Sequence, residues 1–173
     1  MSAFVNKVAA SGILTIDLAQ FLPEYEEFTE LDIKQFLYME MILKEKDFRE
    51  QVKTYDWSVF QDKYVSILND DEAIVPAWAF MIIATHLKGV AKDVFLGNKE
   101  EHFKNRVLSS IAEFEIDSYA DQRVVIKGCG DKSIPDFAFL KIAQRLLPHV
   151  KSVMYGEPCS TVPVYKRKTV LPK

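Results

Sequence analysis

The two cysteines of the sequence are the residues best suited to metal or thiol chemistry, and both lie among small and polar residues. Cys129 stands in the segment GCGD of residues 128–131, and Cys159 stands in EPCST of residues 157–161. Two thiolates with a carboxylate suit a soft-to-borderline transition metal, and flanking glycines let backbone N–H groups approach a ligand. The predicted metal ligands are Cys129, Cys159, Asp131 and Glu157, and the predicted ligand-binding residues are Gly128, Gly130, Ser160 and Thr161.

Several interpretations of these residues stay open. The first is metal binding or iron–sulfur chemistry, in which a homodimer could complete a four-thiolate site, although no paired C-x-x-C signature occurs. The second is a thiol-dependent enzyme that uses Cys129 on a small anionic substrate, although no histidine is placed as its base. The third is a non-catalytic interaction protein. In each case the cysteines could instead be small apolar residues of the core.

Other known site types are disfavoured. Neither G-x-x-x-x-G-K-[ST] nor G-x-G-x-x-G occurs, which argues against a phosphate loop and a dinucleotide fold. His86 and His102 fall within predicted helices, and we interpret them as ordinary surface or packing residues.

An internal repeat predicts where the cysteines lie in the fold. When the sequence is shifted by 59 residues, residues 60–98 align with residues 119–157 without a gap, and 12 of the 39 positions are identical. Chance would give about two or three. Each copy has the pattern strand, helix, strand, so both cysteines follow strands of the second copy, at the strand ends where open parallel sheets bind ligands. Neighbouring strands would bring these ends to about 5 Å from one another.

These elements predict a layered α/β sheet with at least four parallel strands, built from two duplicated βαβ units, with helices on both faces. The predicted strands are residues 12–18, 64–68, 93–96, 123–127 and 152–155. One helix is expected from Pro76 to Gly89, and a second begins near Ile134 with Ser133 as its N-cap. Two further helices are expected, one over residues 99–114 and one over residues 32–53. In the last of these, the residues expected in the core are Phe36, Leu37, Met41, Leu43 and Phe48.

Composition and charge limit the class of protein. The chain has 173 residues, 49% of them hydrophobic, which predicts one α/β domain over 1–173. A net charge of −3 gives no reason to expect nucleic acid as a partner. The absence of a long apolar run or a secretory pattern predicts a cytoplasmic protein that does not contact a membrane. Residues 160–173 are expected to form a basic tail that either is solvated or acts as a lid, a partner contact or an anion contact.

Five motifs resemble a bacterial family of domains of unknown function, the one numbered 2480. They are LKEKDFR (43–49), DWS (56–58) followed by Tyr64-Val65, IVPAWA (74–79), VVIKGCGD (124–131) and MYGEPCSTVP (154–163). The resemblance covers nearly the whole chain, and the last two motifs are the most distinctive. It carries no assigned activity and no catalytic residues. It implies an association with iron–sulfur cluster assembly proteins, and hence an accessory role in metal or sulfur handling.

Overall fold

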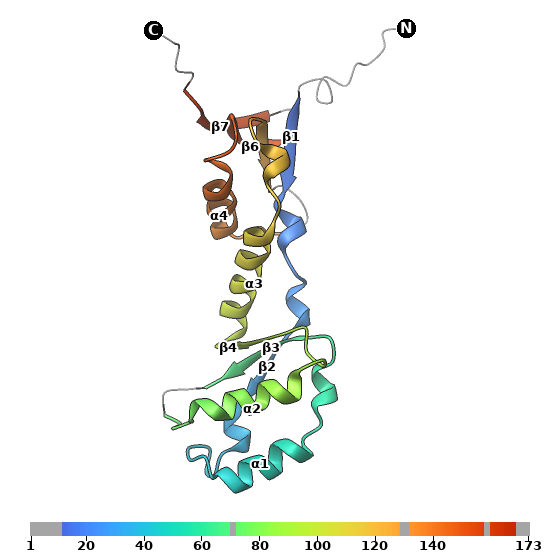
Figure 1. Ribbon diagram of the computed structural model, residues 1–173, viewed down its shortest axis with the longest axis vertical. Helices are drawn as coiled ribbons and strands as arrows, with labels where there is room; N and C mark the ends of the chain where they lie inside the picture. The colour runs from blue at the N-terminus through green and yellow to red at the C-terminus, as the bar shows by residue number, and fades with distance from the viewer. Residues whose placement is uncertain (1–11, 70–71, 129–131, 158–159, 169–173) are drawn as a thin grey trace. The chain divides into compact units, whose positions relative to one another are not determined.

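The computed structural model describes residues 12–69, 72–128, 132–157 and 160–168, and its contacts divide the chain into two compact units. Unit 1 combines residues 1–22 with residues 107–173, and unit 2 is residues 23–106. Among the described residues, seven strands form two separate sheets, one in each unit (Figure 1). The helix α3 (Lys99–Glu113) contributes residues to both units.

Unit 2 is built on a parallel three-stranded sheet of order β2-β3-β4. Its elements are β2 (Phe28–Asp32), α1 (Glu45–Thr54), β3 (Tyr64–Leu68), α2 (Ala77–Leu87) and β4 (Asp93–Leu96). Phe48 of α1 and Ile83 of α2 are fully buried and join Val65 and Ile67 of β3 in one hydrophobic cluster. Because an all-parallel sheet needs cover for its apolar side chains, these two helices are what makes the short strands stable.

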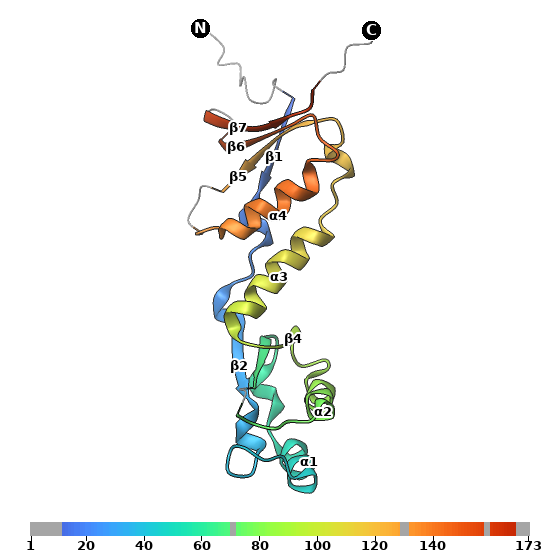
Figure 2. The ribbon, with the colours of Figure 1, turned by 90° about the vertical axis from the view of Figure 1, so that its left-hand side faces the viewer.

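Unit 1 is built on a four-stranded sheet of order β1-β5-β6-β7. Its elements are β1 (Ile13–Asp17), β5 (Arg123–Lys127), α4 (Asp136–Leu146), β6 (Ser152–Glu157) and β7 (Ser160–Lys166). The first three strands of this order are parallel, and β7 runs antiparallel to β6. Helix α4 lies alongside this sheet (Figure 2). Its residues Ala138, Ile142 and Leu146 recur every fourth position and are fully buried, as an amphipathic helix on a sheet requires.

The α/β class predicted from the sequence is confirmed, but the arrangement of strands differs. The single layered sheet with at least four parallel strands is replaced by a parallel three-stranded sheet and a mostly parallel four-stranded sheet. The N-terminal strands decide this division, because β1 pairs with β5 while β2 pairs with β3. Pairing partners far apart in the chain are set by tertiary packing, which a local pattern of apolar residues does not encode.

The two βαβ segments have matching local geometry at positions 59 residues apart. Tyr64 pairs with Asp93 in unit 2, and Arg123 pairs with Ser152 in unit 1. The residue two positions before each first strand also matches, since Asp62 and its counterpart Asp121 have φ values of 57° and 56°. This similarity of local geometry does not test whether the two βαβ segments arose by duplication, which stays a prediction.

The long helix predicted over residues 32–53 is wrong. The chain instead forms a short 3-10 helix (Ile33–Phe36), a loop, and then α1. The Asp32 carboxylate accepts a hydrogen bond from the Lys34 backbone N–H at 2.9 Å, a local contact that competes with α-helix formation. Met39 and Glu40 then adopt φ values of 52° and 60°, which no α-helix allows.

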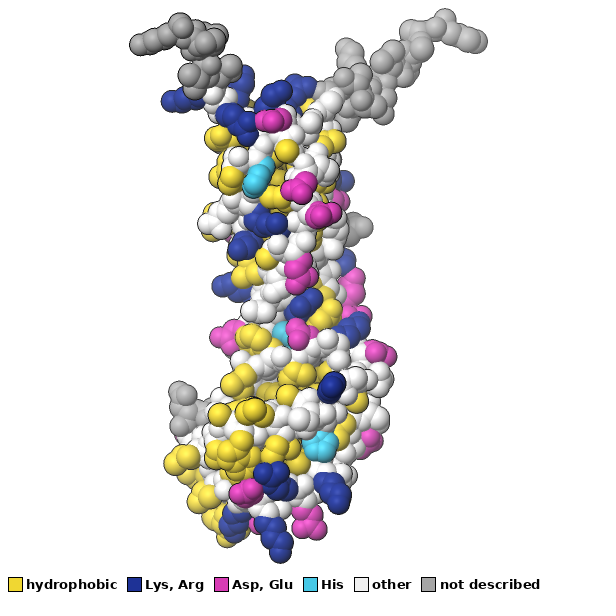
Figure 3. Space-filling model, in the orientation of Figure 1, with side chains coloured by type: hydrophobic (Ala, Val, Ile, Leu, Met, Phe, Trp, Pro, Cys, Tyr) yellow, Lys and Arg dark blue, Asp and Glu magenta, His cyan; other side chains and the backbone are white. Residues whose placement is uncertain are grey.

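The loop that replaces the helix forms an exposed apolar patch on unit 2. Phe36, Leu37 and Phe48 are buried as expected, and Leu43 packs against the core, but Met41 is 53% exposed. Backbone bridges join Tyr38 to Ile42 and Ile42 to Ile74, so their exposed side chains cluster on one face. Figure 3 shows hydrophobic side chains gathered over this part of unit 2. We call the residues Tyr38, Met39, Met41, Ile42 and Ile74 the apolar patch.

Two further details differ near the C-terminus. Residues 160–166, expected in a basic tail, form β7 because their backbone groups pair with the exposed edge of β6. Helix α4 begins at Asp136 with Pro135 as its N-cap, so the prediction that Ser133 caps it is wrong. Among the described residues, no helix has both the length and the apolar character needed to cross a membrane.

Candidate functional site

The candidate site lies at the carboxyl ends of β5 and β6 in unit 1. These two strands are parallel neighbours in register, with Val125 opposite Met154 and Ile126 opposite Tyr155. The apolar run Val124–Ile126 is buried and fixes β5 in the middle of the sheet. Ile126 and Tyr155 are the last residues that pair these two strands with one another, and their backbones lie about 5 Å apart.

The predicted site residues divide into two groups. Cys129, Gly130, Asp131 and Cys159 lie outside the described residues, and the convergence of the two thiols remains a prediction. Gly128, Glu157, Ser160 and Thr161 are described, and all of them lie at this end of the sheet. Glu157 and Ser160 are register partners of β6 and β7, and Thr161 is opposite Gly156.

Gly128 is required by a close approach to helix α4. A Cβ atom at this position would lie 2.1 Å from Cζ and 2.6 Å from Cε1 of the Phe139 ring. That ring packs edge-on against Tyr155, with centroids 5.5 Å apart. The glycine expected to free the backbone near Cys129 thus also makes room for an aromatic contact between α4 and β6.

Gly156 allows β6 to turn toward β7. Its φ of 117° is a conformation that side chains with a Cβ rarely adopt. A Cβ there would also lie 2.6 Å from the backbone oxygen of Ser160. This glycine therefore lets the end of β6 approach the start of β7 closely.

Lys127 is a charged residue of the site that the sequence analysis missed. Its Nζ lies 3.5 Å from Oε1 of Glu157, and both side chains are about one-third exposed, at 33% and 37%. An ion pair this accessible to solvent is weak, so the Glu157 carboxylate can exchange partners. The sequence signal was the lysine directly before Gly128, at the last position of a predicted strand.

The described residues do not complete a metal site by themselves. No group of three or more His, Cys, Asp or Glu side chains within the described ranges could hold an ion. Glu157 is the one predicted ligand that is described, and it contacts Lys127. The donor set of thiolates and carboxylates suits a transition metal chemically, and both thiols belong to segments outside the described residues.

A separate polar cluster surrounds His102 in unit 2. Its Nδ1 lies 3.0 Å from Oγ of Ser66, and its Nε2 lies 3.5 Å from Oδ2 of Asp93 without forming a hydrogen bond. Burial lowers the pKa of His102, an effect that Asp93 partly opposes, so the neutral imidazole is favoured. Because Ser66 and His102 are both 0% exposed, the Ser66 hydroxyl cannot meet a substrate, and the cluster is part of the core.

Comparisons with known proteins give a family but no function. A family model described as "Protein of unknown function (DUF2480)" matches residues 2–167 of the 173-residue chain, which confirms the resemblance drawn from the motifs. Neither the curated proteins nor the solved structures include a significant match.

Proposed function

The chain belongs to the family DUF2480, and from that premise we propose that it is a metal-binding protein with an accessory role in iron–sulfur cluster assembly. Cys129 and Cys159 supply thiolate ligands, and Asp131 or Glu157 completes or orients the site. The observation that carries the proposal is the in-register pairing of β5 with β6, because each strand leads directly into one of the cysteine segments.

Electrostatics at the strand ends supports thiolate ligands. Lys127 is the last residue of β5, and Cys129 follows it by two positions in the sequence. A cation close to a thiol favours its deprotonated form. Ser160 and Thr161 are hydrogen-bond donors at the start of β7, where they could hold a ligand or a coordinating carboxylate. When bound, the metal would supply Lewis acidity or a docking point for sulfide.

An origin of the two βαβ segments by duplication is part of this proposal. Where the second copy has Gly128-Cys129-Gly130-Asp131, the first has Asn69-Asp70-Asp71-Glu72, which has no thiol. The second copy would then have acquired the metal site on a scaffold shared by both. Because each chain brings two cysteines, a homodimer could supply four thiolates to one cluster.

Metal analysis under anaerobic conditions tests this function. The full chain is purified without an affinity tag, and its metal content is measured beside that of Cys129→Ser and Cys159→Ser. We expect stoichiometric metal in the wild type and a loss of at least tenfold in either serine variant. Val162→Ala, an exposed residue of β7 that has no thiol and no proposed role in the site, is the matched control and should retain the metal.

The same variants separate the alternatives. Absence of metal from the wild type, or equal metal in the Cys129→Ser/Cys159→Ser double variant, contradicts the proposal. Rapid alkylation of Cys129 relative to Cys159, without bound metal, would indicate a thiol-dependent enzyme acting on a small anionic substrate.

The apolar patch of unit 2 favours a second candidate function, that of a non-catalytic interaction protein. Its five side chains are each at least half exposed, and methionine-rich surfaces of this kind adapt to partners. Under this function the double serine variant would keep its oligomeric state and its partner binding unchanged.

A further inference from the structure

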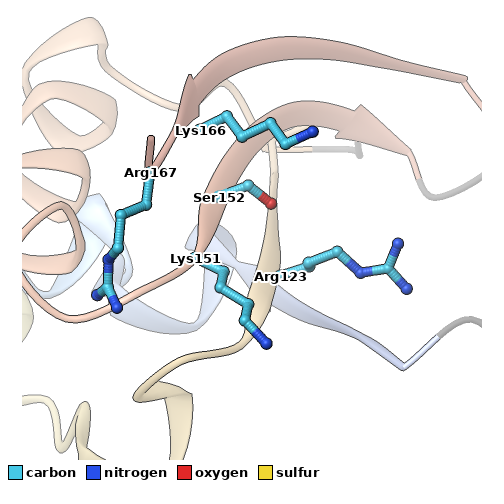
Figure 4. Close-up of a pocket in the computed structure, with 5 residues that line it drawn as sticks. All are labelled: Arg123, Lys151, Ser152, Lys166 and Arg167. Atoms are coloured by element: carbon cyan, nitrogen blue, oxygen red, sulfur yellow. The ribbon is translucent and has the colours of Figure 1, made fainter. Parts of the chain in front are cut away.

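Unit 1 contains a basic cavity at the end of its sheet opposite the cysteine segments. The cavity has a volume of about 220 Å³ and is lined by Arg123, Lys151, Ser152, Lys166 and Arg167 (Figure 4). These residues come from the start of β5, the start of β6 and the end of β7. We call these five residues the basic pocket.

The sheet itself arranges the basic pocket. Arg123 is the register partner of Ser152, and Ser152 is the register partner of Lys166, so the three form one row across β5, β6 and β7. Directly opposed residues project from the same face of a sheet with their Cβ atoms about 5 Å apart. Figure 4 shows their side chains extending to the same side. Ser152 therefore lies between the two basic residues of this row.

Arg167 is held in place before any ligand binds. Its backbone N–H donates a hydrogen bond to the Lys151 carbonyl at 2.8 Å, and its Nη2 donates to the His149 carbonyl at 2.9 Å. Its Nη1 forms an ion pair with Asp121. Fixing the guanidinium in advance lowers the conformational entropy that binding would cost.

None of the five residues that line the basic pocket is acidic. The pocket has four cationic side chains, and the Asp121 carboxylate contacts Arg167. Lys151 and Lys166 form no ion pair with any carboxylate of the described residues. A bound anion would give these two ammonium groups a partner and would thereby stabilise the folded chain.

The equivalent place in unit 2 shows the contrast. A shift of 59 residues places Ser152 at the position of Asp93 and Lys151 at the position of Lys92. In unit 2 the Asp93 carboxylate lies 3.6 Å from Arg106, and Lys92 pairs with Glu27 at 2.7 Å. Unit 2 thus supplies its own anions, whereas unit 1 has a neutral hydroxyl where the acid would be.

We propose that the basic pocket binds the phosphoryl group of a small phosphorylated molecule or of free phosphate. A phosphoryl dianion presents several acceptor oxygens, which match the Lys151 and Lys166 ammonium groups and the Ser152 hydroxyl that line this cavity. The cavity has room for a phosphoryl group. This site uses none of the residues of the proposed metal site.

Titration with inorganic phosphate and inorganic pyrophosphate tests the proposal. Binding to the full chain is followed by calorimetry at low ionic strength, and by the rise in melting temperature that each anion causes. We expect saturable binding that weakens as salt is added. The Lys151→Ala/Lys166→Ala variant should bind at least tenfold more weakly and lose the rise in melting temperature. Both lysines are exposed, so this variant should fold.

A matched control distinguishes a site from general charge. Lys168 is exposed and lies outside the basic pocket, and Lys168→Ala should change the affinity less than twofold. Phosphorylated sugars that bind more tightly than free phosphate would identify the source as a metabolite. Equal losses in both variants, or no binding by the wild type, would overturn the proposal. Tighter binding of a single-stranded oligonucleotide than of pyrophosphate would also overturn it.

Discussion

Replacing Gly128 with alanine should destabilise unit 1 by overpacking its contact with α4. The new Cβ would lie 2.1 Å from Cζ of Phe139, whereas ordinary contacts begin at 3.4 Å, so the ring must retreat by about 1.3 Å. Two neighbours oppose this movement. The ring packs edge-on against Tyr155, and the buried residues Ala138 and Ile142 hold α4 on the sheet.

The expected size of the effect follows from two opposing contributions. Overpacking costs about 1–3 kcal/mol of unfolding free energy. Alanine also reduces the conformational entropy of the unfolded chain, which raises the free energy of unfolding by about 0.4–1 kcal/mol. This gain applies because Gly128 does not need a positive φ. We therefore expect a net loss of about 1–2 kcal/mol.

A double-mutant cycle identifies the contact responsible. Urea unfolding of Gly128→Ala, Phe139→Leu and the double variant is followed by far-UV circular dichroism, which reports the loss of helix and strand in both units, and the two backgrounds are compared. In the Phe139→Leu background the shorter side chain leaves space, so the alanine should cost less than about 0.5 kcal/mol. Equal costs in the two backgrounds would refute the steric reasoning.

Two further changes test other parts of the fold. Burial lowers the pKa of His102 in the folded state. As the pH falls below about 6.5, His102 is therefore protonated in the unfolded state before it is protonated in the folded state, and the free energy of unfolding should decrease. Below the pKa of the folded state His102 is protonated in both states and should cause no further decrease. His102→Gln should flatten the stability profile measured between pH 7 and pH 5, and an unchanged slope would assign the effect to other groups. Ile142→Ala should cost about 2–5 kcal/mol of unfolding free energy because the side chain is fully buried. Leu140→Ala, on the exposed side of α4, should stay within about 0.5 kcal/mol in the same urea assay, and similar losses would contradict the assigned burial.

Strands with strong local patterns could be predicted from the sequence. The bounds expected for β3, β4 and β5 are those observed, because β-branched and aromatic residues fill these short runs and polar or turn residues flank them. The strand-helix-strand order also placed the segments of Cys129 and Cys159 after β5 and β6, which proved to be parallel neighbours.

Local sequence patterns predicted the wrong secondary structure in two segments, residues 32–53 and residues 160–166. The apolar residues of 32–53 fit a helical period, yet the hydrogen bond from the Lys34 N–H to the Asp32 carboxylate and the positive φ of Met39 favoured a loop. The row of basic residues near the C-terminus gave no sign that Lys166 would form the end of a strand, because an edge strand is stabilised by backbone pairing with a partner rather than by its own residues.

The sequence by itself determined the α/β class, the family, and which residues follow the central strands, since each of these depends on residue types and their local spacing. Only the tertiary structure decided that the strands form two sheets, and that Lys166 joins Arg123 and Lys151 around one cavity. Those outcomes depend on which distant segments pair, and that choice is made by the free energy of packing the whole chain.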